Sequence, residues 1–348
     1  LKENVAVGGS PSAIVAADFN NDNNLDLAVA NAGANNVSIL TGDGKGGFHS
    51  AASPATGSNP MFLAAGDIDN DGDPDLAVAN SGSNNVSILL GNGDGTFEEA
   101  LNTEATGDSP EGLALGDLNG DGNPDLAVSN LNSGDLVVLL GNGNGTFAAG
   151  EKLAGLNHPR GVTIKDFNND GKPDLAVADS DSNAAVVFLG KGDGSFEEQR
   201  VSAKVGESPR ALVAADFNND NKPDLAVANY SSNNISILLG KGDGSFEEQR
   251  IFNVGEKPSA IATGSYNGDA KPDLAVANSG ANSVSVLLGN GDGTFEDPAI
   301  GFLASAWSGA LFGGVGSLLL FPLILWLWGI WADEERRARL LARIGLRR

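Results

Sequence analysis

The sequence predicts an all-β fold, a six-bladed β-propeller of four-stranded blades, followed by one C-terminal transmembrane α-helix. The first observation is a repeat, because acidic residues followed by Asp-Leu-Ala-Val recur six times, every 49 or 50 residues. The second is a run of 21 uncharged residues near the C-terminus. A fixed period of this length indicates repeated supersecondary units. The predicted organisation is a propeller over 1–299, a linker over 300–310, a transmembrane helix over 311–331 and a basic tail over 332–348.

Each repeat contains four short apolar runs, which in the second unit are Met61–Ala65, Leu76–Ala79, Val86–Leu90 and Phe97–Thr103. Each run is only a few residues long and is bounded by Gly, Asn or Asp, as strands are and ordinary helices are not. Within the second run, large residues alternate with alanine, which suits a sheet packed on both faces. Four strands at this period describe one propeller blade.

The N-terminal residues Leu1–Val7 precede the first Ser-Pro as Gln199–Val205 precede a later one. We therefore expect the N-terminal segment to form the outer strand of the last blade. Sharing that blade between the two ends of the chain would close the ring and leave no exposed sheet edge.

The 348-residue chain carries a net charge of −24, and 41% of its residues are hydrophobic, enough for a sizeable core. The tail 332–348 holds six Arg, which leaves 15 basic and 42 acidic residues upstream, a net charge of −27. Such a body repels nucleic acid and attracts cations. The absence of cysteine excludes disulfides and thiolate metal sites.

The acidic segment of each repeat reads D-x-[DN]-x-D-[GN]-x-x-D between the first two strands. Positions 1, 3, 5 and 9 offer side-chain oxygens and position 7 a backbone carbonyl, which is the hard oxygen set that Ca²⁺ prefers. The alternative is that the Asp and Asn residues only shape solvated turns. An EF-hand is excluded because Val78 would occupy its twelfth position and flanking helices are absent.

We therefore predict five complete Ca²⁺ sites and a sixth, weaker one, in which Ser265 replaces the first Asp and Ala270 the glycine. The predicted ligand positions are Asp18, Asn20, Asp22, Asn24 and Asp26; Asp67, Asp69, Asp71, Asp73 and Asp75; Asp117, Asn119, Asp121, Asn123 and Asp125; Asp166, Asn168, Asp170, Lys172 and Asp174; Asp216, Asn218, Asp220, Lys222 and Asp224; and Asn267, Asp269, Lys271 and Asp273.

This loop, followed by Leu-Ala-Val-Ala and then Leu-Gly-x-Gly-Asp-Gly-x-Phe, resembles the FG-GAP/VCBS repeat family, which includes the propellers of integrin α-subunits. The resemblance covers residues 1 to about 300. It implies a propeller with calcium hairpins on one face and a role in adhesion or extracellular recognition. The chain departs from integrins in having six repeats, no inserted domain and a defective sixth loop.

The uncharged run Leu311–Trp331 is long enough to span a bilayer core as a helix of roughly 30 Å. All four tryptophans lie in this region, as in interfacial belts. The arginines beyond it predict a cytoplasmic tail and a periplasmic or extracellular propeller. A buried core helix, or a C-terminal sorting signal that is later removed, is the alternative. Small residues at four-residue spacing, Ser305, Gly309, Gly313 and Ser317, predict packing against another transmembrane helix.

Near-identical repeats make their differences informative, and two variable positions fall on the face opposite the acidic loops. They are Ser12, Met61, Glu111, Arg160, Arg210 and Ser259 after the proline of each first strand, and Ala32, Ser81, Leu131, Ser180, Tyr230 and Ser279 after each second strand. The larger residues predict a partner-binding surface of Arg160, Arg210, Tyr230, His158 and Leu131, because Arg and Tyr often anchor interfaces. Drift in unconstrained loops is the alternative.

The predicted function is that of a membrane-anchored, calcium-stabilised binding or adhesion propeller with a protein or glycan ligand. One alternative is an accessory scaffold subunit of a membrane complex, docked on other transmembrane subunits. A carbohydrate-active enzyme is the second alternative. No catalysis is expected, because His49 and His158 lack an evident nucleophile and the carboxylates belong to the loops.

Overall fold

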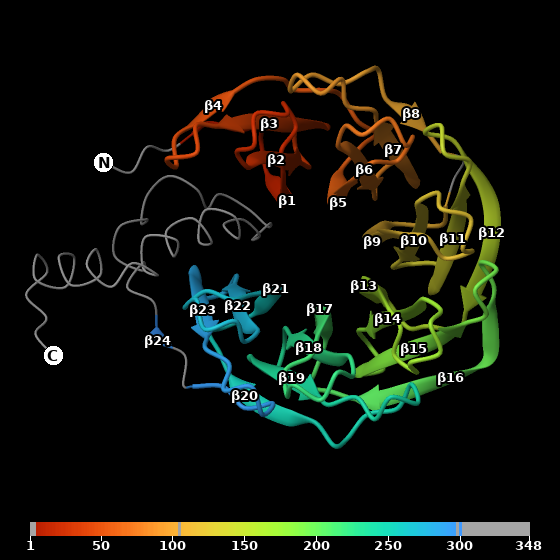
Figure 1. The fold of residues 1–348 in the computed structure, drawn as a ribbon, viewed down its shortest axis with the longest axis vertical. Helices are drawn as coiled ribbons and strands as arrows, with labels where there is room; N and C mark the ends of the chain where they lie inside the picture. Colours follow the sequence, from red (N-terminus) through yellow and green to blue (C-terminus); the bar gives the residue numbers. More distant parts are fainter. Residues whose placement is uncertain (1–4, 104–105, 297–298, 301–348) are drawn as a thin grey trace, which may run out of the picture.

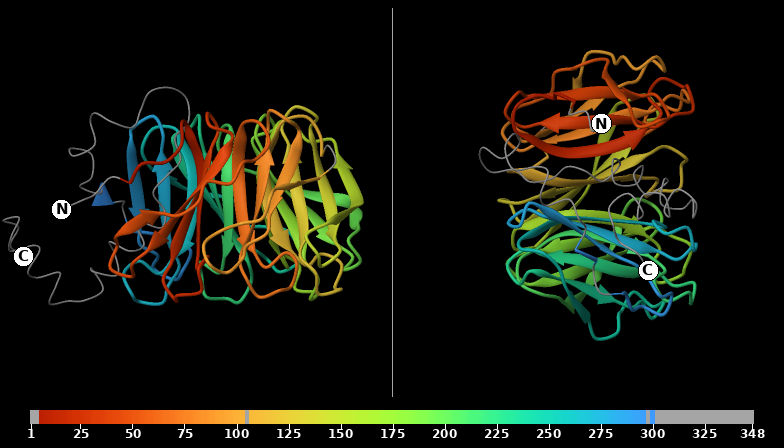
Figure 2. Two further views of the ribbon diagram at one scale, coloured as in Figure 1. Left: turned by 90° about the horizontal axis from the view of Figure 1, so that it is seen from above. Right: turned by 90° about the vertical axis from the view of Figure 1, so that its left-hand side faces the viewer.

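Six four-stranded antiparallel sheets are arranged around a common axis in the computed structural model, which describes residues 5–103, 106–296 and 299–300 (Figure 1). Each sheet takes four strands that are consecutive in the sequence, so each repeat is one blade. Seen from the side, the blades form a disc with loops on both faces (Figure 2). The predicted six-bladed propeller of four-stranded blades is confirmed.

The strands are assigned by their place in the blade, and blades 1 to 6 follow the sequence. The first strands, nearest the axis, are β1 (Pro11–Ala17), β5 (Pro60–Gly66), β9 (Pro110–Gly116), β13 (Pro159–Lys165), β17 (Pro209–Ala215) and β21 (Pro258–Gly264). The second are β2 (Asp26–Asn31), β6 (Asp75–Asn80), β10 (Asp125–Asn130), β14 (Asp174–Asp179), β18 (Asp224–Asn229) and β22 (Asp273–Asn278). The third are β3 (Asn36–Gly42), β7 (Asn85–Leu89), β11 (Asp135–Gly141), β15 (Ala184–Gly190), β19 (Asn234–Leu238) and β23 (Ser283–Leu287). The outer strands are β4 (Phe48–Ser50), β8 (Leu101–Asn102), β12 (Phe147–Ala154), β16 (Phe196–Lys204), β20 (Arg250–Asn253) and β24 (Ala299–Ile300).

The second strand of every blade is buried along its whole length. In β6, Leu76 and Val78 belong to the cluster shared with blade 1, whereas Ala77 and Ala79 belong to the cluster shared with blade 3. The predicted alternation is therefore confirmed. Each fully buried Leu or Val stabilises the folded state by roughly 1.5–3 kcal/mol. Because these residues pack between blades, the contacts between blades form most of the core.

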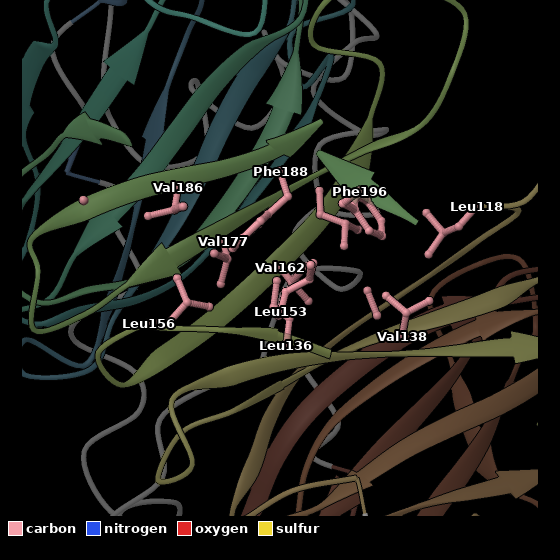
Figure 3. Packing of buried hydrophobic residues seen from close by; sticks show 13 residues of the cluster. Leu118, Leu136, Val138, Leu153, Leu156, Val162, Val177, Val186, Phe188 and Phe196 are labelled. Atoms are coloured by element: carbon pink, nitrogen blue, oxygen red, sulfur yellow. The ribbon is translucent and has the colours of Figure 1, made fainter. Parts of the chain in front are cut away.

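Neighbouring blades share one buried cluster at each of five junctions, from blades 1 and 2 to blades 5 and 6. Figure 3 shows the junction of blades 3 and 4, where Val138 of β11 and Val162 of β13 lie in one cluster. Three junctions add an edge-to-face ring pair, in which the residue after the first loop Asp meets the Phe of the next blade's hairpin. These pairs are Phe19–Phe97, Phe167–Phe246 and Phe217–Phe295, with centroids 5.6–6.0 Å apart.

The outer strand of blade 6 differs from the prediction. Ala299 and Ile300 form β24, which pairs with Val286 and Ser285 of β23. The expected N-terminal strand is wrong for the described residues, since Val5–Val7 lie in no strand, and Leu1–Asn4 lie outside them. The physical reason is the entropy cost of closing a loop, which grows with the number of residues between the paired strands. The segment after Phe295 follows β23 closely in the sequence, whereas the N-terminal segment is far from it.

The junction between blades 6 and 1 is consequently unlike the others. No hydrophobic cluster of the described residues joins these blades, and the cluster of Tyr266, Ala275 and Val286 lies within blade 6. Tyr266 occupies the position of Phe19 in blade 1 and is only 3% exposed. Its hydroxyl is buried with no hydrogen-bond partner among the described residues.

Tyr266→Phe should therefore stabilise the protein. Removing a buried hydroxyl that has no partner should raise the free energy of unfolding by about 1 kcal/mol. Chemical denaturation at fixed calcium measures the change.

The matched control is Phe217→Tyr, which places the same hydroxyl in the closed junction of blades 5 and 6. It should lower the free energy of unfolding by roughly 1–3 kcal/mol. A loss of stability in Tyr266→Phe would show instead that the hydroxyl makes a favourable bond.

Candidate metal loops and a cationic rim

The acidic loops all lie on one face of the disc, here called the loop face. Each begins where a first strand ends and closes where the second begins, as in the pairing of Gly66 with Asp75. The hairpins after the third strands, such as Gly91 to Phe97, reach the same face because successive strands are antiparallel. The opposite face, called the rim face, carries the connections from second to third strands and the entry into each first strand.

The second loop shows how these residues shape the backbone. The two carboxylate oxygens of Asp67 accept hydrogen bonds from the backbone N–H groups of Asp71 and Gly72, both at 3.0 Å. Asp71 accepts one from the N–H of Asp73 at 2.8 Å. The sixth position has a positive φ in every loop, at Asn23, Gly72, Gly122, Gly171, Asn221 and Ala270. The alternative that the Asp and Asn side chains shape the turn is therefore correct for the backbone of the loop. It does not exclude a cation, since each carboxylate keeps further lone pairs.

The side chains of the second loop also converge. Asp67, Asp69 and Asp71 each place a carboxylate oxygen within 4.8 Å of the others. Burial, and next the charge of Asp71, raises the pKa of Asp69. In the other loops the third position is Asn, which supplies a neutral oxygen: Asn20, Asn119, Asn168, Asn218 and Asn267. An all-oxygen donor set of this kind fits Ca²⁺.

The ninth position of the loop has a second role that the sequence did not reveal. In every blade its carboxylate is fully buried and accepts two backbone N–H bonds, one from the second loop residue and one from the glycine that ends the third run. In blade 3 these bonds run from Leu118 at 2.8 Å and Gly141 at 2.7 Å to Asp125. The six residues are Asp26, Asp75, Asp125, Asp174, Asp224 and Asp273.

Burial raises the pKa of these carboxyls, to about 6 for Asp75, Asp174 and Asp224. A cation close to such a carboxylate would favour its charged form and offset the cost of burial. Among the described residues, Asp75 is not one of the carboxylates that converge in the second loop, so the observed role of the ninth position is to join the two hairpins of the blade.

The seventh position differs between blades. Asp73 and Asn123 accept hydrogen bonds from Asn21 and Asn70 of the preceding loop, at 2.6 and 2.9 Å. These bonds link the loops of blades 1, 2 and 3. In blades 4 and 5 the position is Lys172 or Lys222, whose Nζ lies 3.8 or 3.6 Å from the fifth-position carboxylate. A lysine here can offer a cation only its backbone carbonyl.

The sixth loop departs from the others as the sequence predicted. Ser265 offers a hydroxyl in place of a carboxylate, and it accepts the N–H of Ala270 at 3.2 Å. Ala270 has φ of +64°, where a Cβ is unfavourable. Asn267, Asp269 and the backbone carbonyl of Lys271 remain in place as donors.

Of the predicted partner-binding residues, the structure brings Arg160, Arg210 and Tyr230 together on the rim face. The guanidinium of Arg210 stacks on the Tyr230 ring, 3.4 Å from its centroid, and the Nζ of Lys257 lies 5.8 Å from the same centroid. Arg160 forms an ion pair with Glu111 of the neighbouring blade. We call Glu111, Arg160, Arg210, Tyr230 and Lys257 the rim cluster.

The other two predicted residues, His158 and Leu131, contact residues that do not belong to this cluster. The exposed His158 has its Nδ1 2.6 Å from the carboxylate of Asp181. Leu131 is half-buried, and its N–H donates to the carbonyl of Ser109. Sequence reasoning missed Lys257, although it directly precedes the proline of β21, and it did not pair Glu111 with Arg160.

The predicted helix-packing residues Ser305, Gly309, Gly313 and Ser317 lie outside the described residues, as does the apolar run 311–331. Within the described part of the chain, no helix has the length and hydropathy needed to cross a membrane.

These features define a propeller of repeated blades, each with an oxygen-rich acidic loop on the same face. The model of the FG-GAP-like repeat matches residues 18–78, 67–128, 117–177, 166–227 and 216–276, and the chain belongs to this family. The resemblance inferred from the sequence is confirmed. No curated protein matches the sequence.

Several solved structures share the fold. A candidate 6-phosphogluconolactonase from Bacteroides uniformis has 17% identity and a TM-score of 0.66, with 84% of this chain and 85% of that chain covered. A lectin from Agrocybe aegerita that recognises non-reducing terminal N-acetylglucosamine has 18% identity and a TM-score of 0.55, with 82% and 78% covered. Virginiamycin B lyase from Staphylococcus aureus has 18% identity and a TM-score of 0.56, with 82% and 83% covered. At this identity the likeness extends to the fold alone.

Asp125→Asn should separate the structural role of the ninth position from metal binding. The amide nitrogen cannot accept the backbone N–H that one carboxylate oxygen accepts, so a buried donor loses its partner. In the presence of chelator, the free energy of unfolding should fall by at least roughly 2 kcal/mol.

The matched control is Asp121→Asn at the exposed fifth position of the same loop. In chelator its effect should stay within about 0.5 kcal/mol, because the amide oxygen can still accept the N–H of Asn123. Equal losses in the two variants would contradict the separate role of Asp125.

Proposed function

We propose that this chain is a calcium-stabilised binding propeller whose loop face holds metal ions and whose rim face recognises a partner. The observation that supports the proposal is the different chemistry of the two faces. Five loops place carboxylate or amide oxygens at positions 1, 3, 5 and 9 on one side, whereas the other side carries a cluster of cations in an otherwise acidic body.

The metal part of the proposal is supported by the loop geometry. Positions 1, 3 and 5 would hold Ca²⁺ with their side-chain oxygens, position 7 with its backbone carbonyl and position 9 with its carboxylate. Bound calcium would neutralise converging carboxylates such as those of Asp67, Asp69 and Asp71. It would also tie the end of the first strand to the start of the second, and so stabilise each blade.

The binding part of the proposal extends to the location of the protein. The run 311–331 would anchor the propeller in a membrane, with the arginine-rich tail 332–348 in the cytoplasm. The propeller would then face the periplasm or the cell exterior, where calcium is available. A role as the outer subunit of a membrane complex uses the same rim face and is the second candidate. We propose no catalytic activity, since the carboxylates of the loops are assigned to metal and to backbone.

Chelation should lower the melting temperature by tens of degrees. At a free calcium concentration of about 100 times the dissociation constant, each site adds roughly 2.7 kcal/mol, so five sites would contribute about as much as the whole stability of an ordinary domain. Thermal unfolding with and without EGTA measures the shift, and excess Mg²⁺ serves as the control ion. A melting curve that chelator leaves unchanged would contradict the proposal.

The double variant Ser265→Asp and Ala270→Gly should create a sixth complete site. It restores the missing carboxylate and removes the Cβ from a left-handed position. Calcium titration by calorimetry should give five strong sites for the natural sequence and six for the variant.

The control is Ser58→Asp, which adds the same charge at an exposed position of the rim face and should leave five sites. An unchanged number of sites in a folded double variant would mean that the loops do not bind calcium as proposed.

A further inference from the structure

The rim cluster contains more positive charge than its own acidic group can neutralise. It has three cations, Arg160, Arg210 and Lys257, and one carboxylate, that of Glu111. Among the described residues, Glu111 pairs with Arg160, while neither Arg210 nor Lys257 forms an ion pair. The surplus is unusual here, because the body of the protein carries a net charge of −27.

The surplus charge is also partly removed from water. Arg210 is half-buried, and burial, followed by the nearby charge of Arg160, lowers the pKa of its guanidinium. The Nε of Arg160 is buried and has no hydrogen-bond partner among the described residues. A buried guanidinium nitrogen without an acceptor is costly, and an anion that supplied the acceptor would relieve that cost.

The positions of the two arginines are set by the strands and by a stacking contact, which favours recognition over chance accumulation of charge. The aromatic ring of Tyr230 holds the Arg210 guanidinium at 3.4 Å. The backbone carbonyl of Arg160 accepts a hydrogen bond from the Ser129 hydroxyl. Both arginines occupy the second position of an innermost strand, β13 or β17, so the scaffold fixes their spacing. Preorganised guanidinium groups lose little entropy when they bind a carboxylate.

The remaining large residues of the rim face indicate what else the ligand carries. Met61 takes the place of Arg160 in blade 2, and Leu131 takes the place of Tyr230 in blade 3. Both side chains are half-buried. The rim face therefore has apolar groups on blades 2 and 3 and cations on blades 4 to 6. This division suits a peptide with both apolar and acidic side chains better than a hydroxyl-rich glycan.

We propose that the rim cluster binds an acidic peptide segment of a partner protein, with one Asp or Glu carboxylate on Arg160 and Arg210 and apolar side chains towards Met61 and Leu131. This assignment rests on the proposed recognition function of the rim face and names its ligand class. Glu111 then acts as an internal competitor, because it occupies Arg160 when the ligand is absent.

The test is selection from a random octapeptide library on the calcium-loaded full chain in detergent. Enriched peptides should combine Asp or Glu with apolar residues. Their affinity should fall at least tenfold in both Arg210→Ala and Arg210→Gln, and the two substitutions guard against a packing effect of either one.

Glu111→Gln should raise the affinity several-fold, because it frees Arg160 for the ligand. A purely structural role of the Glu111–Arg160 pair predicts no such gain. The matched control is Arg200→Ala, which removes the same charge from the outer strand β16 and should leave the affinity unchanged. Melting temperatures with calcium verify that all variants are folded.

Three results would overturn the assignment in different ways. If no acidic peptide is enriched, but uronic-acid oligosaccharides bind and depend on Arg210, the ligand class is wrong and the recognition surface stands. If enriched peptides bind the folded double variant Arg160→Ala and Arg210→Ala as tightly as the natural protein, the recognition surface itself lies elsewhere. A library without any enrichment, together with no glycan binding, would contradict both the assignment and the proposed function of the rim face.

Discussion

A buried carboxylate at the start of each second strand is the interaction on which the rest of the structure depends. It accepts one N–H from the acidic loop and one from the glycine hairpin, at 2.7–2.9 Å in all six blades. A charged group without solvent is unfavourable unless its bonds are complete. The requirement therefore fixes both turns of the loop face relative to the same strand.

The two faces of the disc follow from this constraint. With the turns of the loop face held in place, the first, third and fifth positions of the acidic loop can repeat one geometry with nearly one sequence. On the rim face the buried residue that ends each second strand is Asn in five blades and Asp179 in blade 4, and the residue after each first-strand proline takes no part in the bonds to the loop-face carboxylates. This explains why Glu111, Arg160 and Arg210 can stand where other blades have Ser12, Met61 or Ser259 without any change in the strands.

Much of the fold and of the loop face could be predicted from the sequence, because the repeat is local and its period is constant. The alternation of Leu76 and Val78 with alanines indicated the packing of the blades, and Ser265 with Ala270 marked the atypical loop. Other features depend on contacts between distant segments. The choice between β24 and the N-terminus for the edge of β23 is a competition that no local pattern decides. The pairing of Glu111 with Arg160 depends on side-chain direction across a junction, which the repeat pattern does not specify. The same holds for the buried hydroxyl of Tyr266, which has no hydrogen-bond partner in the part of the chain that the structure describes.

We propose that calcium ions and the buried carboxylates together fix the turns of the loop face. A crystal structure of the protein grown in calcium tests it most directly, with anomalous scattering used to locate the ions. We expect an ion in each of the first five loops, bound by the side-chain oxygens of positions 1, 3 and 5, and weak or no density in the sixth. Loops that keep the same backbone without any ion, or ions bound only elsewhere, would contradict it.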